Sequence, residues 1–88
     1  MVIHKYIIDN INMLELPEGS KILSVHNQKD RVVLYAAVNT DSLQTEHYQI
    51  DRVCTGESIS YEEEWIFIGT VMIYDGSFVV HIFYRKEE

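Results

Sequence analysis

The side chains with catalytic or metal-binding chemistry are few and scattered in this sequence. His4, His26, His47, His81 and the single Cys54 are the soft metal ligands, and none lies two to five residues from another. Structural zinc sites need closely spaced ligand pairs, so the sequence predicts no metal site. The glycines are also too far apart for a phosphate-binding loop or a nucleophile elbow. We therefore expect no cofactor and no enzymatic activity.

A cluster of acidic side chains offers one possible binding surface. The chain has a net charge of -7, and Glu57, Glu62, Glu63 and Glu64 lie just ahead of its most apolar segment. Carboxylates on a rigid β scaffold can imitate the phosphates of DNA and occupy a basic protein groove, although such charges also keep a small apolar protein soluble. The acidic balance argues against ordinary nucleic-acid binding.

A second set of side chains could hold a small anionic ligand. It combines cations, which bind phosphate, with tyrosines, which stack on a base. The set consists of Lys21, Arg31, Tyr35, Tyr48 and Arg52. If the chain assembles with itself, we expect this pocket to form between subunits.

Residues 65–84 form a hairpin that is apolar on nearly every position. Asp75-Gly76 favours a type I′ turn, in which both central residues have positive φ. A strand that is apolar on both faces needs cover on both faces, and a chain of 88 residues supplies little cover itself. The sequence therefore predicts a homo-oligomer. The expected interface residues are Trp65, Phe67, Ile73, Phe78, Val80 and Ile82.

Strand-length segments separated by turn residues recur along the whole chain. The expected strands cover residues 2–8, 10–16, 21–26, 31–38, 44–53, 65–74 and 78–84. We expect turns at 17–20 and 27–30, a central strand at 31–38, an exposed edge at 44–53 and one helical turn starting near Ser60. This pattern predicts a single all-β domain over residues 1–88, an antiparallel meander of about seven strands in a small sandwich or open barrel.

The compartment can also be inferred from the sequence. A lone cysteine and the lack of a signal-like N-terminal segment favour a reducing, cytosolic setting. No apolar run reaches about 18 residues, so we expect no membrane span.

Four segments resemble a known family in their order along the chain. They are Leu16–Val25, Leu34–Val38, Phe67–Val71 and Phe78–Phe83. Together they are similar to small phage and prophage proteins that contain a domain of unknown function. The resemblance implies a phage or prophage origin and a location in the host cytoplasm.

The same resemblance implies a role through binding. Small accessory phage proteins without catalytic motifs often act on host machinery in this way. We expect counter-defence, in which the chain inhibits a host immune effector or nuclease by direct protein binding. One alternative is a homo-oligomer that sequesters a cyclic-nucleotide or ADP-ribose-type immune signal between subunits. Another is a structural or assembly role in the virion.

Overall fold

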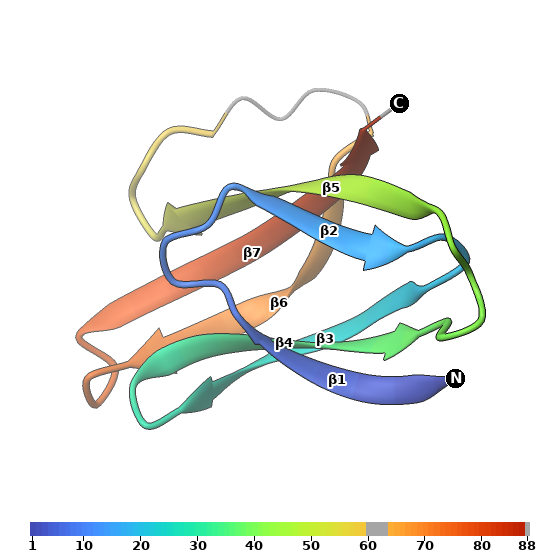
Figure 1. The fold of residues 1–88 in the computed structure, drawn as a ribbon. Helices are drawn as coiled ribbons and strands as arrows, with labels where there is room; N and C mark the ends of the chain where they lie inside the picture. The colour runs from blue at the N-terminus through green and yellow to red at the C-terminus, as the bar shows by residue number, and fades with distance from the viewer. Residues whose placement is uncertain (60–63, 88) are drawn as a thin grey trace.

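The structure is a computed structural model that describes residues 1–59 and 64–87. Within these ranges the chain forms seven strands and no helix, and all paired strands are antiparallel. The strands are β1 (Val2–Ile7), β2 (Met13–Pro17), β3 (Lys21–Gln28), β4 (Arg31–Val38), β5 (Thr45–Cys54), β6 (Ile66–Ile73) and β7 (Phe78–Glu87). Figure 1 shows two facing layers rather than a closed barrel. The predicted all-β sandwich is confirmed.

The strand order determines which strands are central. One sheet has the order β1-β4-β3 and the other β2-β5-β7-β6, so the chain crosses between sheets after β1, β2 and β4 and is less sequential than a simple meander. The central place predicted for residues 31–38 is confirmed. The exposed edge predicted for residues 44–53 is wrong, because β5 lies between β2 and β7. Its alternating pattern arises because only one of its faces packs inward.

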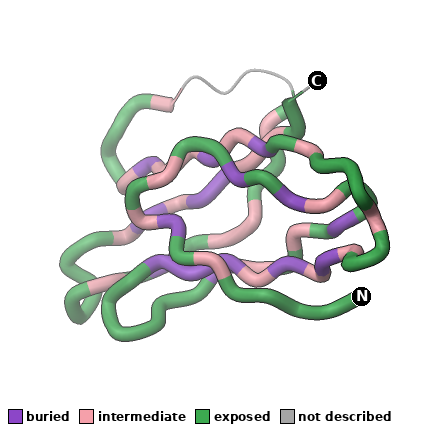
Figure 2. The backbone as a smooth tube through the Cα atoms, in the orientation of Figure 1, coloured by how far each residue is buried: buried purple, intermediate pink, exposed green. Residues whose placement is uncertain are grey.

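The core fills the space between the two sheets. Leu16, Leu34 and Ile82, from three different strands, are fully buried. Burying an aliphatic side chain of this size stabilises the fold by about 1.5 to 3 kcal/mol. Figure 2 shows this buried layer along the middle strands, whereas β1 is exposed over almost its entire length. The core therefore covers the middle strands more completely than it covers β1.

The tight turns follow the residues that tolerate positive φ. Asp75 and Gly76 have φ values of 54° and 84°, as the predicted turn requires, and Ser77 N donates to the carbonyl of Tyr74. The predicted turn at 17–20 is also present. The loop predicted at 27–30 is wrong in length, since β3 continues to Gln28 and only two residues form the turn.

Side-chain hydrogen bonds join the two sheets where β3 meets β6. Asn27 Nδ2 donates to the carbonyl of Met72 at 2.6 Å, and Tyr74 N donates to Asp30 Oδ1 at 2.9 Å. Gly69 permits the close approach, because a Cβ added there would lie 3.1 Å from a methyl group of Val25. These contacts fix one long edge of the sandwich.

Two further sequence predictions concern segments 60–63 and 65–84. The helical turn expected near Ser60 lies outside the described residues. The hairpin of β6 and β7 is covered by the core on one face only, and its other face points outward. No helix in the described ranges has the length and hydropathy needed to span a membrane.

Candidate functional site

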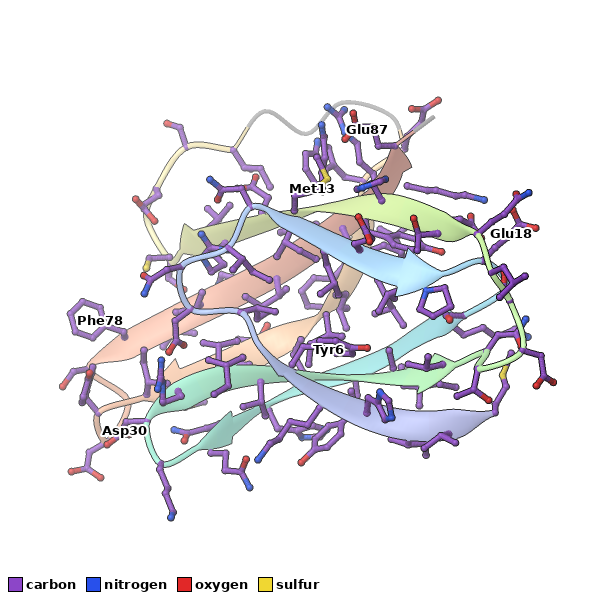
Figure 3. The ribbon with its side chains drawn as sticks, viewed as in Figure 1. Tyr6, Met13, Glu18, Asp30, Phe78 and Glu87 are labelled. Atoms are coloured by element: carbon purple, nitrogen blue, oxygen red, sulfur yellow. The ribbon has the colours of Figure 1, made fainter. Side chains whose placement is uncertain are left out.

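Large apolar side chains gather on the outer face of the four-stranded sheet. Met72 and Phe83 alternate with the inward-pointing Val71 and Ile82, so both point away from the core. Phe67 points the same way because the pairing of β6 with β7 shifts by one residue between Phe67 and Gly69. Phe67 and Met72 are 51% and 61% exposed. This group, called the apolar face below, consists of Trp65, Phe67, Met72 and Phe83; Phe83 is largely covered by its neighbours, and the polar pair Thr70 and His81 separates Met72 from the aromatic rings. In Figure 3, Met13 and Glu87 project from the same side of the molecule.

Contacts among aromatic and polar groups give the apolar face a fixed shape. The rings of Phe67 and Phe83 lie 5.4 Å apart at an interplanar angle of 56°. The guanidinium of Arg85 lies 4.6 Å from the ring centroid of Trp65, and Arg85 Nε donates to Gln49 Oε1 at 2.5 Å. The Trp65 ring is therefore held over the sheet by a cation–π contact.

Acidic residues surround the apolar face. Asp51 lies opposite Phe83 in the β5–β7 register, and Glu57 borders a hollow that Phe83 also lines. Glu64 and Glu87 border another hollow beside Arg85. Of the predicted acidic cluster, Glu57 and Glu64 are exposed, whereas Glu62 and Glu63 lie outside the described residues.

Cys54 and Glu57 form a small turn at the border of this face. Glu57 Oε1 accepts a hydrogen bond from Cys54 N at 2.6 Å. Burial raises the pKa of the Cys54 thiol, and the neighbouring carboxylate of Glu57 raises it further. The thiol is therefore held in its protonated form at neutral pH, which makes it a poor nucleophile.

His81 lies on the same outer face with both ring nitrogens engaged. Nε2 is 2.8 Å from Thr55 Oγ1, and Nδ1 is 3.0 Å from Thr70 Oγ1. A metal would have to displace one of these hydroxyl groups. Across residues 1–59 and 64–87, no three His, Cys, Asp or Glu side chains are placed to hold one ion.

The structure places the members of the predicted ligand-binding set in two separate regions. Lys21, Arg31 and Tyr35 all lie on the outer face of the three-stranded sheet. Tyr48 is instead buried in the core, where desolvation raises its pKa, and Arg52 points inward to bond the Ile11 carbonyl and Asn12 Oδ1. Their assignment to a shared pocket is therefore wrong, because both lie on the inward face of β5.

The predicted oligomer interface is divided in the same way. Val80 and Ile82 belong to the chain's own core, so their assignment to an interface is wrong. Ile73 is half-buried on the inward face of β6 and packs against the core. Trp65, Phe67 and Phe78 remain accessible.

An open cleft lies at one end of the sandwich. It has a volume of about 460 Å³, and its lining includes Asp9, Arg52, Cys54 and Phe78. Figure 3 places Phe78 and Asp30 at this end, opposite Glu18. The Arg52 guanidinium is already committed to protein acceptors and the Cys54 thiol is protonated. The cleft thus offers a mixed polar and aromatic surface without an activated group.

Two cations that the sequence-based set omitted join Arg31 on the three-stranded sheet. Lys5 and Lys29 border a hollow of about 200 Å³ together with Arg31. Lys5 is more than 20 residues from Lys29 and Arg31 in the sequence, and only the pairing of β1 with β4 brings it beside them. Nothing in the local pattern around Lys5 signals this placement.

Comparisons with known proteins identify one family. A family model described as Domain of unknown function (DUF7352) matches residues 1–88. No curated protein and no solved structure matches the chain.

Proposed function

We propose that this chain, which belongs to the DUF7352 family, acts by non-catalytic binding of another protein through its apolar face. The resemblance to phage and prophage proteins supports an origin in a phage or prophage. On that basis the partner is a host immune effector or nuclease, which the chain inhibits in the host cytoplasm.

The observation that carries this proposal is the exposure of Phe67 and Met72 on a sheet face. The outer face of an antiparallel sheet is ordinarily polar. Here Phe67 is more than half exposed close to the ring of Trp65, which Arg85 holds in place, and Met72 is more than half exposed further along β6, beyond Thr70 and His81. Aromatic residues, methionine and arginine are the side chains enriched in the centres of protein interfaces. The apolar face therefore has the composition of an interface core.

The charges around the apolar face indicate what kind of protein would bind. Asp51, Glu57, Glu64 and Glu87 lie at its border, and Arg85 is the cation that stacks within it. A second copy placed face to face would bring like charges together, which costs several kcal/mol. A partner with a basic rim around an apolar centre complements this border. Nucleases and nucleotide-binding effectors carry such basic surfaces because their substrates are anionic.

The predicted homo-oligomer stays a prediction, and the oligomeric state of the purified chain tests it. Light scattering of the purified chain at micromolar concentration gives its oligomeric state. A monomer leaves the apolar face free for a host protein. A dimer that Met72→Lys dissociates would show that a second copy occupies the face, and it would refute the host-protein proposal.

The test is a pull-down from host lysate with matched variants. We expect the wild-type chain to retain one protein, identified by mass spectrometry, and to inhibit the purified protein's activity. Met72→Lys and Glu64→Lys should abolish both retention and inhibition. Leu23→Lys is the matched control, because Leu23 is 48% exposed but lies on the other sheet. Equal loss with Leu23→Lys, or retention without inhibition, would contradict the proposal.

A further inference from the structure

The two sheets differ sharply in charge. Strands β1, β3 and β4 contain no aspartate or glutamate, although the chain has 14 acidic residues. The same strands contain Lys5, Lys21 and Arg31, and Lys29 lies in the turn between β3 and β4. The three-stranded sheet is therefore a basic surface on an acidic protein. Lys5, Lys21 and Arg31 point outward. Arg31 and the register partners of the two lysines, Tyr35 and Ala37, alternate along β4 with residues that point into the core.

Three of these cations surround one hollow. Lys5, Lys29 and Arg31 border a space of about 200 Å³, and Ile7 and Val33 contribute apolar side chains to its lining. Val33 is only 2% exposed although it lies on the outer face, so it gives the hollow a solid floor. We propose that this hollow, called the basic hollow below, binds the phosphate group of a nucleoside phosphate.

Hydrogen bonds position two of the cations before any ligand arrives. Lys5 Nζ donates to Gln28 Oε1 at 2.7 Å, which draws its ammonium across β4 toward the β3–β4 turn. Arg31 Nε donates to Asp9 Oδ2 at 2.8 Å, and this leaves both Nη groups of Arg31 to donate to a phosphate. Asp9 is itself anchored, because its Oδ1 accepts from Val32 N at 2.7 Å.

The acidic groups nearby reduce the positive charge without cancelling it. Burial of Asp9 favours its neutral form, but the bonds from Arg31 and Val32 N outweigh burial and lower its pKa, so it is ionised at neutral pH. It offsets one of the three cations. The carboxylate of Asp30 accepts from Tyr74 N and is thereby held toward the β6–β7 turn. The basic hollow therefore retains a net positive charge.

The backbone at Lys29 gives a second, independent indication. Its φ is 53°, a left-handed conformation that favours glycine or asparagine and costs other residues about 1 to 2 kcal/mol. Turns of this kind prefer Asn-Gly, yet the chain has Lys29-Asp30. Lysine at this position weakens the turn and supplies a cation to the basic hollow.

Aromatic rings next to the basic hollow suit a nucleobase. Tyr35 lies opposite Lys5 in the β1–β4 register and packs edge-on against His26, with ring centroids 5.6 Å apart. Tyr35 is half-buried on the outer face of the sheet. Because Lys5 lines the basic hollow, a base on the Tyr35 ring would lie at the Lys5 side of the hollow, with its phosphate directed toward Lys5. This inference is independent of the protein-binding proposal, because it uses the opposite sheet.

The test is a titration of the 15N-labelled full chain with adenosine monophosphate, followed by amide chemical shifts at about 150 mM salt, where the carboxylates on the far sheet are largely screened. We expect saturable shifts at Gln28, Lys29 and Arg31, with weaker binding of inorganic phosphate and none of adenosine. Shifts confined to other regions, or equal affinity for inorganic phosphate and adenosine monophosphate, would overturn the proposed ligand.

Two single-charge variants separate a specific site from general attraction. Lys29→Asn removes one cation from the basic hollow while introducing a residue that suits the left-handed turn, so it should keep or raise the melting temperature. We expect it to weaken nucleotide binding at least about fivefold. Lys21→Gln removes the same charge at the other end of the sheet and should change the affinity less than about twofold. Equal weakening by both variants would refute a defined site.

Discussion

Asp30 allows the strength of the contact between the two sheets to be measured. Its Oδ1 accepts a hydrogen bond from Tyr74 N, and its φ of 59° is in the left-handed region that aspartate tolerates better than alanine. Asp30→Ala removes the acceptor and also places a less tolerant residue at this φ. We expect the free energy of unfolding to fall by about 2 kcal/mol, with about 1 kcal/mol from each effect.

Two other variants separate these contributions. Asp75→Ala is the matched control, because Asp75 has a φ of 54° but its side chain makes no hydrogen bond to the described residues. It should cost about 1 kcal/mol from backbone strain alone. Asp30→Asn keeps an acceptor oxygen and a residue type that suits positive φ, so it should cost about 0.5 kcal/mol or less.

The assay is equilibrium unfolding in urea, followed by the fluorescence of Trp65, the single tryptophan. For a chain of this size a loss of 1 kcal/mol lowers the melting temperature by about 4 to 8 °C, so thermal unfolding gives a second measurement. If Asp30→Ala and Asp75→Ala are equally destabilised, the hydrogen bond from Tyr74 contributes nothing. If Asp30→Asn is as unstable as Asp30→Ala, the assignment of the energy to acceptor and backbone is wrong.

Three further predictions concern pH, core packing and thiol reactivity. The ion pair with Lys86 and the hydrogen bond from Gly19 N lower the pKa of Glu46, so their contribution to the free energy of unfolding should be full above the ordinary carboxylate range and fall as pH drops below about 4. Glu46→Gln should make this acid transition, followed by circular dichroism, less steep. An unchanged transition would contradict the prediction. Leu34→Ala should lower the free energy of unfolding by about 2 to 5 kcal/mol in urea titrations, since Leu34 is fully buried; a loss below 1 kcal/mol would be inconsistent with a close-packed core. Cys54 should react with a disulfide reagent at pH 7 more slowly than free cysteine because its pKa is raised, and a rate equal to that of free cysteine would argue against this environment.

Local sequence patterns predicted the elements that depend on neighbouring residues. The turn at Asp75-Gly76 follows from the φ values that these residues tolerate, and the central place of residues 31–38 follows from the demand for cover on both faces of an apolar strand. The exposed edge predicted for residues 44–53 was wrong for a related reason. Alternation reports that one face of a strand is exposed, and it does not report whether the strand has one neighbour or two.

The candidate sites depended on pairing between distant segments, which local patterns do not contain. Tyr48 and Arg52 differ by an even number of positions, so they share one face of β5, and that face points into the sandwich. Lys5 reaches the basic hollow only because β1 pairs with β4 across more than 20 residues of chain. The composition gives the net charge, but the gathering of cations on one sheet becomes visible only when the strand order is known.

Because positive and negative charges lie on different sheets, the electrostatic force on an approaching anion depends on ionic strength as well as on the net charge. The molecule is only 17 Å across its shortest dimension, and the screening length is about 8 Å at physiological ionic strength and about 30 Å at 0.01 M. In the cell, an anion near Lys29 is therefore largely shielded from the carboxylates on the far sheet. In dilute buffer it experiences the full charge of -7. Ordinary attraction between an anion and a cation weakens as salt is added, whereas association with this sheet should pass through a maximum at intermediate ionic strength.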